Sequence, residues 1–151
     1  MTIFFDMDGT IANLYGITNW LEKLQKNNPS PYEEAKVMLN MSLLARYLNK
    51  IKRAGYSIGI ISWLSKQSTP EYDEAVTAAK IKWLNNHLPS VKWDIIHIVK
   101  YNTPKQQYKK NKLDILFDDE LKNRINWGHN SYKPEQIISV LKKIAIKVKT
   151  T

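Results

Sequence analysis

The sequence of 151 residues contains no cysteine and only five glycines and six prolines. Without cysteine, neither a disulfide framework nor a thiolate metal site can form, which fits a reducing compartment. No apolar run approaches the roughly 20 residues that a membrane-spanning helix needs, and no basic lead-in or cleavage site precedes the first apolar stretch. We therefore expect a cytoplasmic protein without a membrane partner.

The composition is typical of one folded domain. Hydrophobic residues make up 43% of the chain, which is enough to bury a core. We predict a single domain over residues 1–151. The net charge is +9, and a basic surface attracts polyanions such as nucleotides and nucleic acid. The lysines are spread along the chain, so solvated positions are favoured over a nucleic-acid interface; the oligomeric state is left open.

Short apolar runs separated by helical patterns predict the fold class. The four runs are Ile3–Phe5, Ile58–Ile61, Ile95–Val99 and Ile115–Phe117. Strands that alternate with helices favour a parallel sheet with crossover connections. The sequence therefore predicts an α/β fold built on a Rossmann-like parallel sheet.

Proline and capping residues predict where the helices begin. The stretch Ser30-Pro31-Tyr32-Glu33 has the pattern of a capping box, and apolar residues at helical spacing extend that helix to Gly55. A second box, Ser68-Thr69-Pro70-Glu71, opens a helix that ends before Pro89. Shorter helices are expected at three further places: near Pro104, between Asp119 and Trp127, and from Pro134.

The segment from Tyr15 to Asn28 does not fit the crossover pattern. Its apolar residues have helical spacing, and they include Trp20. In one interpretation they pack on the body of the domain. In the other, residues 15–30 form a small helical cap inserted after the first strand, with Tyr15 or Trp20 facing a ligand.

The run Asp6-Met7-Asp8-Gly9-Thr10 is the most informative part of the chain. It places two carboxylates, one residue apart, at the carboxyl end of a buried strand, where open α/β sheets bind ligands. One carboxylate can attack or hold a metal, and the other can move a proton. The same pattern occurs in turns and in calcium loops. A calcium loop is flanked by helices, however, whereas a strand precedes this run.

The later strands also end in residues capable of chemistry. Ser62 ends the second strand, Lys105 follows the third, and Asp118-Asp119 ends the fourth. Taken singly, each has a structural alternative: a strand-end cap, a surface lysine or a helix cap. Because parallel strands point the same way, these side chains are expected to converge with Asp6 and Asp8 on one crevice. Carboxylates, a hydroxyl and an ammonium suit phosphoryl transfer, and so many carboxylates require a cation such as Mg²⁺.

These motifs, in this order, resemble the four motifs of the haloacid dehalogenase (HAD) superfamily of phosphatases. The resemblance implies that Asp6 is the nucleophile and a Mg²⁺ ligand. Asp8 would be the general acid and base, with its backbone carbonyl on the metal. Ser62 and Lys105 would bind the transferring phosphoryl group. Asp119 would complete the metal shell, directly or through water, and Asp118 would orient Lys105 or the metal-bound water. Which member of that pair ligates the metal directly is left open.

Within the superfamily, Ile115–Asp119 together with Asn123 and Trp127 is similar to the 5'(3')-deoxyribonucleotidase branch. The resemblance implies a Mg²⁺-dependent hydrolase of nucleoside monophosphates that works through an aspartyl-phosphate. The chain departs from the branch in its shorter length, its reduced cap and Trp63 after the motif serine. Base recognition is therefore not carried over, and Trp63 joins Tyr15 and Trp20 as a candidate substrate contact.

Two alternatives to a nucleotidase stay open at this point. The basic charge and small cap suit a phosphatase that acts on the 3'-phosphate ends of nucleic acid. A non-catalytic module that binds nucleotides would keep the same site without turnover. A substrate panel and a nucleotide-binding measurement distinguish the nucleotidase, the 3'-end phosphatase and the binding module.

Overall fold

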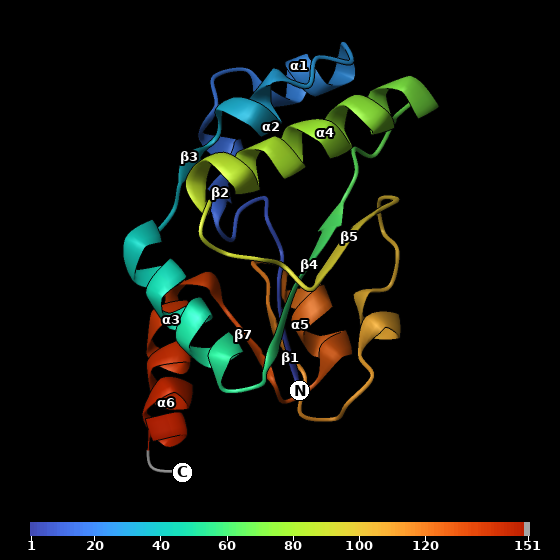
Figure 1. Ribbon diagram of the computed structural model, residues 1–151. Helices are drawn as coiled ribbons and strands as arrows, with labels where there is room; N and C mark the ends of the chain where they lie inside the picture. The colour runs from blue at the N-terminus through green and yellow to red at the C-terminus, as the bar shows by residue number, and fades with distance from the viewer. Residues whose placement is uncertain (150–151) are drawn as a thin grey trace.

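The computed structural model describes residues 1–149 and contains a five-stranded parallel sheet (Figure 1). The strand order is β5-β4-β1-β6-β7, and β1 pairs with both β4 and β6. The bounds are Thr2–Phe5 for β1, Ser57–Trp63 for β4, Ile95–Val99 for β5, Ile115–Phe117 for β6 and Ser131–Tyr132 for β7. The predicted α/β fold with a parallel sheet is confirmed. Residues 150 and 151 of the predicted domain lie outside the described residues.

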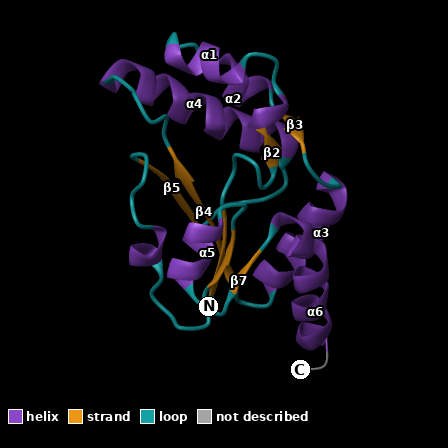
Figure 2. Ribbon diagram, turned by 180° about the vertical axis from the view of Figure 1, so that it is seen from behind, coloured by secondary structure: helices purple, strands orange, loops and turns teal. Residues whose placement is uncertain are grey.

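Side chains of the central strand alternate between two apolar layers. Ile3 and Phe5 point into the larger cluster, which includes side chains of α3 (Met41–Arg53) and α6 (Ile137–Lys149). Phe4 points to the other face and meets Trp127 of α5 (Leu121–Trp127) edge to face, with ring centroids 5.8 Å apart. Figure 2 shows α5 on one side of the sheet and α3 with α6 on the other. Both faces of β1 are therefore buried.

The second predicted capping box marks a helix start. The helix α4 (Pro70–His87) follows Thr69, whose hydroxyl accepts a hydrogen bond from the Tyr72 backbone N–H at 3.2 Å. Gly128, with a φ of 105°, ends α5 as expected. The stretches near Pro104 and Pro134 begin with 3₁₀ turns, η2 (Lys105–Tyr108) and η3 (Pro134–Gln136), and η3 leads into α6.

The prediction of one helix from Ser30 to Gly55 is wrong. Helix α2 (Ser30–Glu34) is short, and the chain then forms β3 (Lys36–Val37), which pairs antiparallel with β2 (Ala12–Asn13). A new helix, α3, begins after Asn40, whose side chain accepts a hydrogen bond from the Leu43 backbone N–H at 3.0 Å. Pairing with β2 satisfies the backbone of β3, so the helix is interrupted there.

The residues between β2 and β3 form a small helical layer, which we call the helical insertion (residues 14–34). It contains η1 (Leu14–Gly16), α1 (Trp20–Gln25) and α2. Figure 1 shows α1, α2 and α4 together at one end of the molecule, beyond the carboxyl ends of the strands. Side chains of the insertion and of α4 share a separate apolar cluster, which includes Tyr32 and Val76. Within residues 1–149 no helix is both long and apolar enough to cross a membrane.

Candidate active site

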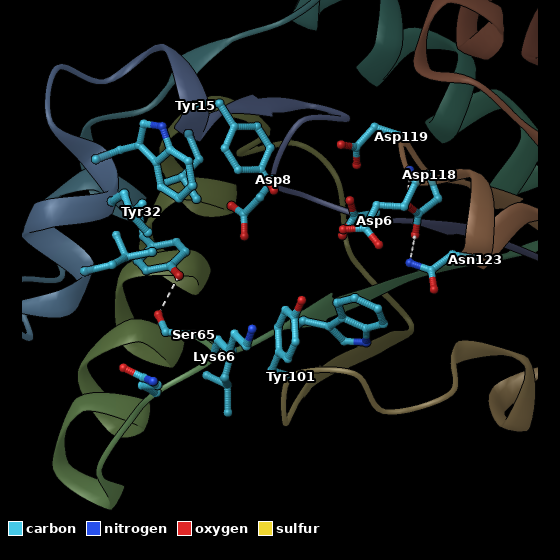
Figure 3. Close-up of a pocket in the computed structure, with 18 of the residues that line it drawn as sticks. Asp6, Asp8, Tyr15, Tyr32, Ser65, Lys66, Tyr101, Asp118, Asp119 and Asn123 are labelled. Carbon is cyan, nitrogen blue, oxygen red and sulfur yellow. Dashed lines mark hydrogen bonds between the residues drawn. The ribbon is translucent and has the colours of Figure 1, made fainter.

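Three carboxylates meet at the carboxyl edge of the sheet. Asp6 follows β1, and Asp118 and Asp119 follow the neighbouring strand β6. One carboxylate oxygen of each residue lies within 4.8 Å of one oxygen of the other two. Figure 3 shows these side chains gathered on one side of a pocket. Parallel pairing of adjacent strands therefore brings together residues that are far apart in the sequence.

Lys105 lies between two of these carboxylates. Its Nζ is 2.9 Å from Asp6 Oδ1 and 2.7 Å from Asp118 Oδ2, and the side chain is buried. Burial would lower the pKa of Lys105, but Asp6 and Asp118 outweigh it and raise the pKa to about 12. The buried ammonium is therefore charged at neutral pH and lies where the transferring phosphoryl group is expected.

Asp118 is held by the protein through both carboxylate oxygens. Oδ1 accepts a hydrogen bond from the Glu120 backbone N–H at 2.9 Å, and Oδ2 accepts from Asn123 Nδ2 at 3.1 Å as well as from Lys105. Burial, with a contribution from Asp6, raises the pKa of Asp118 to about 6. Burial and then Asp6 raise the pKa of Asp119 to about 8. Asp119 thus has fewer protein partners to offset its charge.

The turn after Asp8 packs tightly against Asp119. Gly9 has a φ of +79°, and a Cβ at this position would lie 2.5 Å from Asp119 Oδ2 and 2.8 Å from the Tyr15 ring. Thr10 Oγ1 lies 3.1 Å from Asp6 Oδ2 and 3.3 Å from Asp119 Oδ1. Only glycine meets both the backbone and the space requirement here.

The donor set fits a divalent cation. Carboxylate oxygens are the ligands that Mg²⁺ prefers, and Asp6, Asp118 and Asp119 offer three of them within reach of one ion. Burial first, and then the charge of Asp6, raises the pKa of Asp118 and of Asp119, and a cation bound between these carboxylates would oppose both effects. Asp8 was predicted to reach the metal through its backbone carbonyl; its carboxylate lies outside this cluster and pairs with Lys80.

Mg²⁺ is therefore expected to raise the thermal stability of the protein. A cation at a concentration about 100 times its Kd would add about 2.7 kcal/mol, which corresponds to roughly 5–10 °C in Tm for a chain of this size. The measurement is thermal unfolding followed by circular dichroism in EDTA and in MgCl₂, with NaCl of equal ionic strength as the control. The variant D119N should lose most of the shift. An unchanged Tm in MgCl₂ would contradict a metal site.

Asp8 and Ser62 are connected by a lysine that the sequence analysis did not single out. Lys80, on α4, is fully buried, and its Nζ donates to Asp8 Oδ2 at 3.0 Å and to Ser62 Oγ at 2.6 Å. Burial raises the pKa of Asp8, although Lys80 opposes the shift. Ser62 is fully buried and does not line the pocket. The sequence did contain a signal for this lysine. Lys80 lies at helical spacing from Val76 and Trp83, so it falls on the buried face of α4.

The pocket has a volume of about 450 Å³. Its chemical side carries Asp6, Asp8, Lys105, Asp118 and Asp119. Its remaining wall is rich in aromatic rings, which form two edge-to-face pairs. The centroids of Tyr15 and Trp20 are 4.9 Å apart, and those of Trp63 and Tyr101 are 5.2 Å apart. All three predicted substrate contacts, Tyr15, Trp20 and Trp63, line this pocket.

Solved structures of other proteins share this fold. The chain superposes on D,D-heptose 1,7-bisphosphate phosphatase from Burkholderia thailandensis with a TM-score of 0.55 and 12% identity, covering 94% of this chain and 96% of that one. A protein described as a HAD-like phosphatase from Mesorhizobium loti gives a TM-score of 0.59 and 12% identity over 97% and 86% of the two chains.

A third similar structure is a chain of the Pnkp1/Rnl/Hen1 complex, with a TM-score of 0.57 and 16% identity. It is matched by 87% of this chain, which spans only 44% of that larger chain. No protein-family model and no curated protein matches the sequence. The chain therefore has the fold of HAD-like phosphatases, as its motifs predicted, while these similarities leave the substrate open.

Proposed function

We propose that the protein is a metal-dependent phosphomonoester hydrolase that acts through an aspartyl-phosphate on Asp6. The observation that carries the proposal is the contact of Asp6 with the buried cation of Lys105, beside Asp118 and Asp119, at the edge of an open pocket. A structural ion cluster would not need a pocket beside it. A nucleophile, a proton donor and positive charge at one cavity are the parts that phosphoryl transfer requires.

The residues divide the reaction between them. A carboxylate oxygen of Asp6 attacks phosphorus, and the bond from phosphorus to the leaving oxygen breaks while Asp8 donates a proton to that oxygen. Asp8 then removes a proton from water, which attacks the phosphorus of the aspartyl-phosphate. The bond between phosphorus and Asp6 breaks and releases inorganic phosphate. Lys105 stabilises negative charge on the phosphoryl oxygens, and a divalent cation, when bound, supplies further positive charge there.

The substrate proposed first is a nucleoside monophosphate. The two aromatic pairs provide flat apolar surfaces on which a base can stack, within the same pocket as the carboxylates. Tyr15 and Tyr101 are 46% and 45% exposed, so both rings are accessible to a ligand. A sugar phosphate without a base would leave these surfaces unused. This arrangement supports a deoxyribonucleotidase-like specificity, with Tyr15, Trp20 and Trp63 as substrate contacts.

A phosphatase acting on nucleic-acid 3'-phosphate ends is the second candidate. The net charge of +9 favours a polyanionic substrate, and Lys66 lies beside the pocket with its Nζ 5.9 Å from the Tyr101 ring centroid. The fold shared with a chain of the Pnkp1/Rnl/Hen1 complex is compatible with this candidate. This candidate requires that the small helical insertion leave room for a nucleic-acid strand beside the pocket.

The test is a phosphate-release panel with Mg²⁺ present. Deoxynucleoside 5'- and 3'-monophosphates, ribose 5-phosphate and a 3'-phosphorylated oligonucleotide are compared by kcat/KM. The first proposal expects a nucleotide to exceed ribose 5-phosphate by about tenfold or more, since stacking is worth roughly 1–3 kcal/mol per base. Preference for the oligonucleotide with strong salt dependence would favour the second candidate. Tight nucleotide binding without turnover would identify a binding module and refute the hydrolase.

A further inference from the structure

Lys80 is a fully buried lysine outside the set of residues that the hydrolase motifs account for. It lies in the middle of α4 and, unlike the motif residues, does not follow a strand in the sequence. Burying an ammonium is costly even when it is paired, and a buried ion pair is weak evidence for a purely stabilising role. The role of Lys80 is therefore better inferred from the groups that it contacts than from its burial.

The three N–H donors of Lys80 have three acceptors. Besides Asp8 Oδ2 and Ser62 Oγ, Nζ donates to the backbone carbonyl of Trp63 at 2.7 Å. The Tyr32 ring covers the same ammonium, with its centroid 4.9 Å from Nζ. With all three donors used, Lys80 is not available to bind a substrate. Lys80 can therefore affect catalysis only indirectly, by positioning the residues to which it donates hydrogen bonds.

Asp8 is the carboxylate among these neighbours of Lys80, and it lines the pocket together with Tyr32 and Trp63. Its side chain is 15% exposed, while that of Lys80 is 0% exposed. Lys80 holds Oδ2, and among the described residues no donor is bonded to Oδ1. The anchor itself is rigid, because Lys80 is also tied to Ser62 and Trp63 at the end of β4. One oxygen of Asp8 is therefore fixed and the other is left for the pocket.

We propose that Lys80 is a positioning residue for Asp8, whose ammonium holds one carboxylate oxygen so that the other is presented to the leaving oxygen of the substrate. The proposal rests on the function proposed above, since it assigns Asp8 the proton transfer. It does not make Lys80 a second phosphate-binding lysine. Under this proposal, Lys80 affects only the step in which Asp8 donates a proton to the leaving oxygen.

The sharpest test uses the leaving group. An activated aryl phosphate, such as 2,4-dinitrophenyl phosphate, departs without protonation, whereas an alkyl phosphate needs the acid. The value of kcat/KM covers the reaction up to release of the leaving group, so it isolates this step. K80M is expected to lower kcat/KM for the best alkyl phosphate of the panel by at least about tenfold more than for the aryl phosphate. A general loss of structure would lower both alike.

The matched control is K82M on the same helix. Lys82 is exposed and pairs with Glu33 Oε1 at 2.5 Å, away from the pocket. The variant K82M should leave kcat/KM unchanged for both the alkyl and the aryl phosphate. A second readout is the double variant. When Asp8 is already asparagine, K80M should lower kcat/KM for the alkyl phosphate by less than about twofold, because the effects of residues that act as a unit are not additive. Equal losses on both substrates, or additive losses with D8N, would overturn the proposal.

Two further outcomes are separated by the same measurements. If K80M does not fold, K80R takes its place, since a planar guanidinium cannot reproduce three converging ammonium contacts, and the same leaving-group dependence is expected. If the unmodified protein hydrolyses neither substrate, the proposed function fails and the role of Lys80 fails with it. If it hydrolyses both and K80M leaves their ratio unchanged, only the role of Lys80 is refuted.

Discussion

The variant D6N is expected to release phosphate from an aryl phosphate at least about a thousandfold more slowly than the unmodified protein. An amide is a poor nucleophile and cannot form the aspartyl-phosphate. The fold should persist, because the change removes a negative charge from a crowded group of carboxylates. The measurement is the rate of phosphate release with Mg²⁺, together with mass spectrometry of the quenched enzyme, in which a phosphate on residue 6 appears only with the unmodified protein.

The matched control for D6N is D94N, which makes the same chemical change at the opposite edge of the sheet. Asp94 Oδ2 accepts a hydrogen bond from the Ile58 backbone N–H at 2.9 Å, near the start of β4. An asparagine retains that acceptor, so activity should be unchanged. If D6N kept more than about a tenth of the activity, another group would have to be the nucleophile.

The variant K105M is expected to lower the free energy of unfolding by about 3–5 kcal/mol. Removal of the ammonium leaves Asp6 and Asp118 buried beside each other without their shared partner. Urea denaturation provides the measurement. Mg²⁺ should restore part of the loss, because it places positive charge near the same carboxylates. Phosphatase activity should also fall sharply, since Lys105 is the residue proposed to stabilise charge on the phosphoryl oxygens.

Lys109 provides the comparison for K105M. It follows the same 3₁₀ turn, and its Nζ donates to the backbone carbonyl of Trp127 at 2.9 Å and pairs with no carboxylate of residues 1–149. K109M should cost only about 1 kcal/mol, the usual net value of such a bond. If the two variants were equally stable to urea, the pairing of Lys105 with the carboxylates would not be what stabilises this region.

Much of the site was predictable because its residues follow strands directly. Asp6, Asp8 and Asp118-Asp119 each come after a short apolar run, and parallel strands deliver such residues to one edge. Lys105 was predicted in the correct region, although a 3₁₀ turn rather than a full helix carries it. Ser62 is the last residue but one of β4, and it accepts a hydrogen bond from Lys80 and is buried without lining the pocket.

The features that escaped prediction depend on tertiary contacts. Strands β2, β3 and β7 have two residues each, too few to leave a periodic pattern. The break between α2 and α3 contains β3, which pairs with β2. The local sequence does not predict this pairing, although Asn40 is a typical capping residue for the helix that follows. Lys80 reaches Asp8 only because α4 crosses the carboxyl end of the sheet. Sequence spacing within a helix carries no information about a partner 72 positions away.

The central place of β1 has a consequence for synthesis of the chain. Its residues are translated before those of its hydrogen-bonding neighbours, which come from Ser57–Trp63 and Ile115–Phe117. Until β6 has left the ribosome, one edge of β1 has no partner, and the apolar side chains of Phe4 and Phe5 lack part of their cover. The strand that precedes Asp6 is therefore enclosed only after β6 has been made, and until then its unpaired edge and apolar surface favour aggregation.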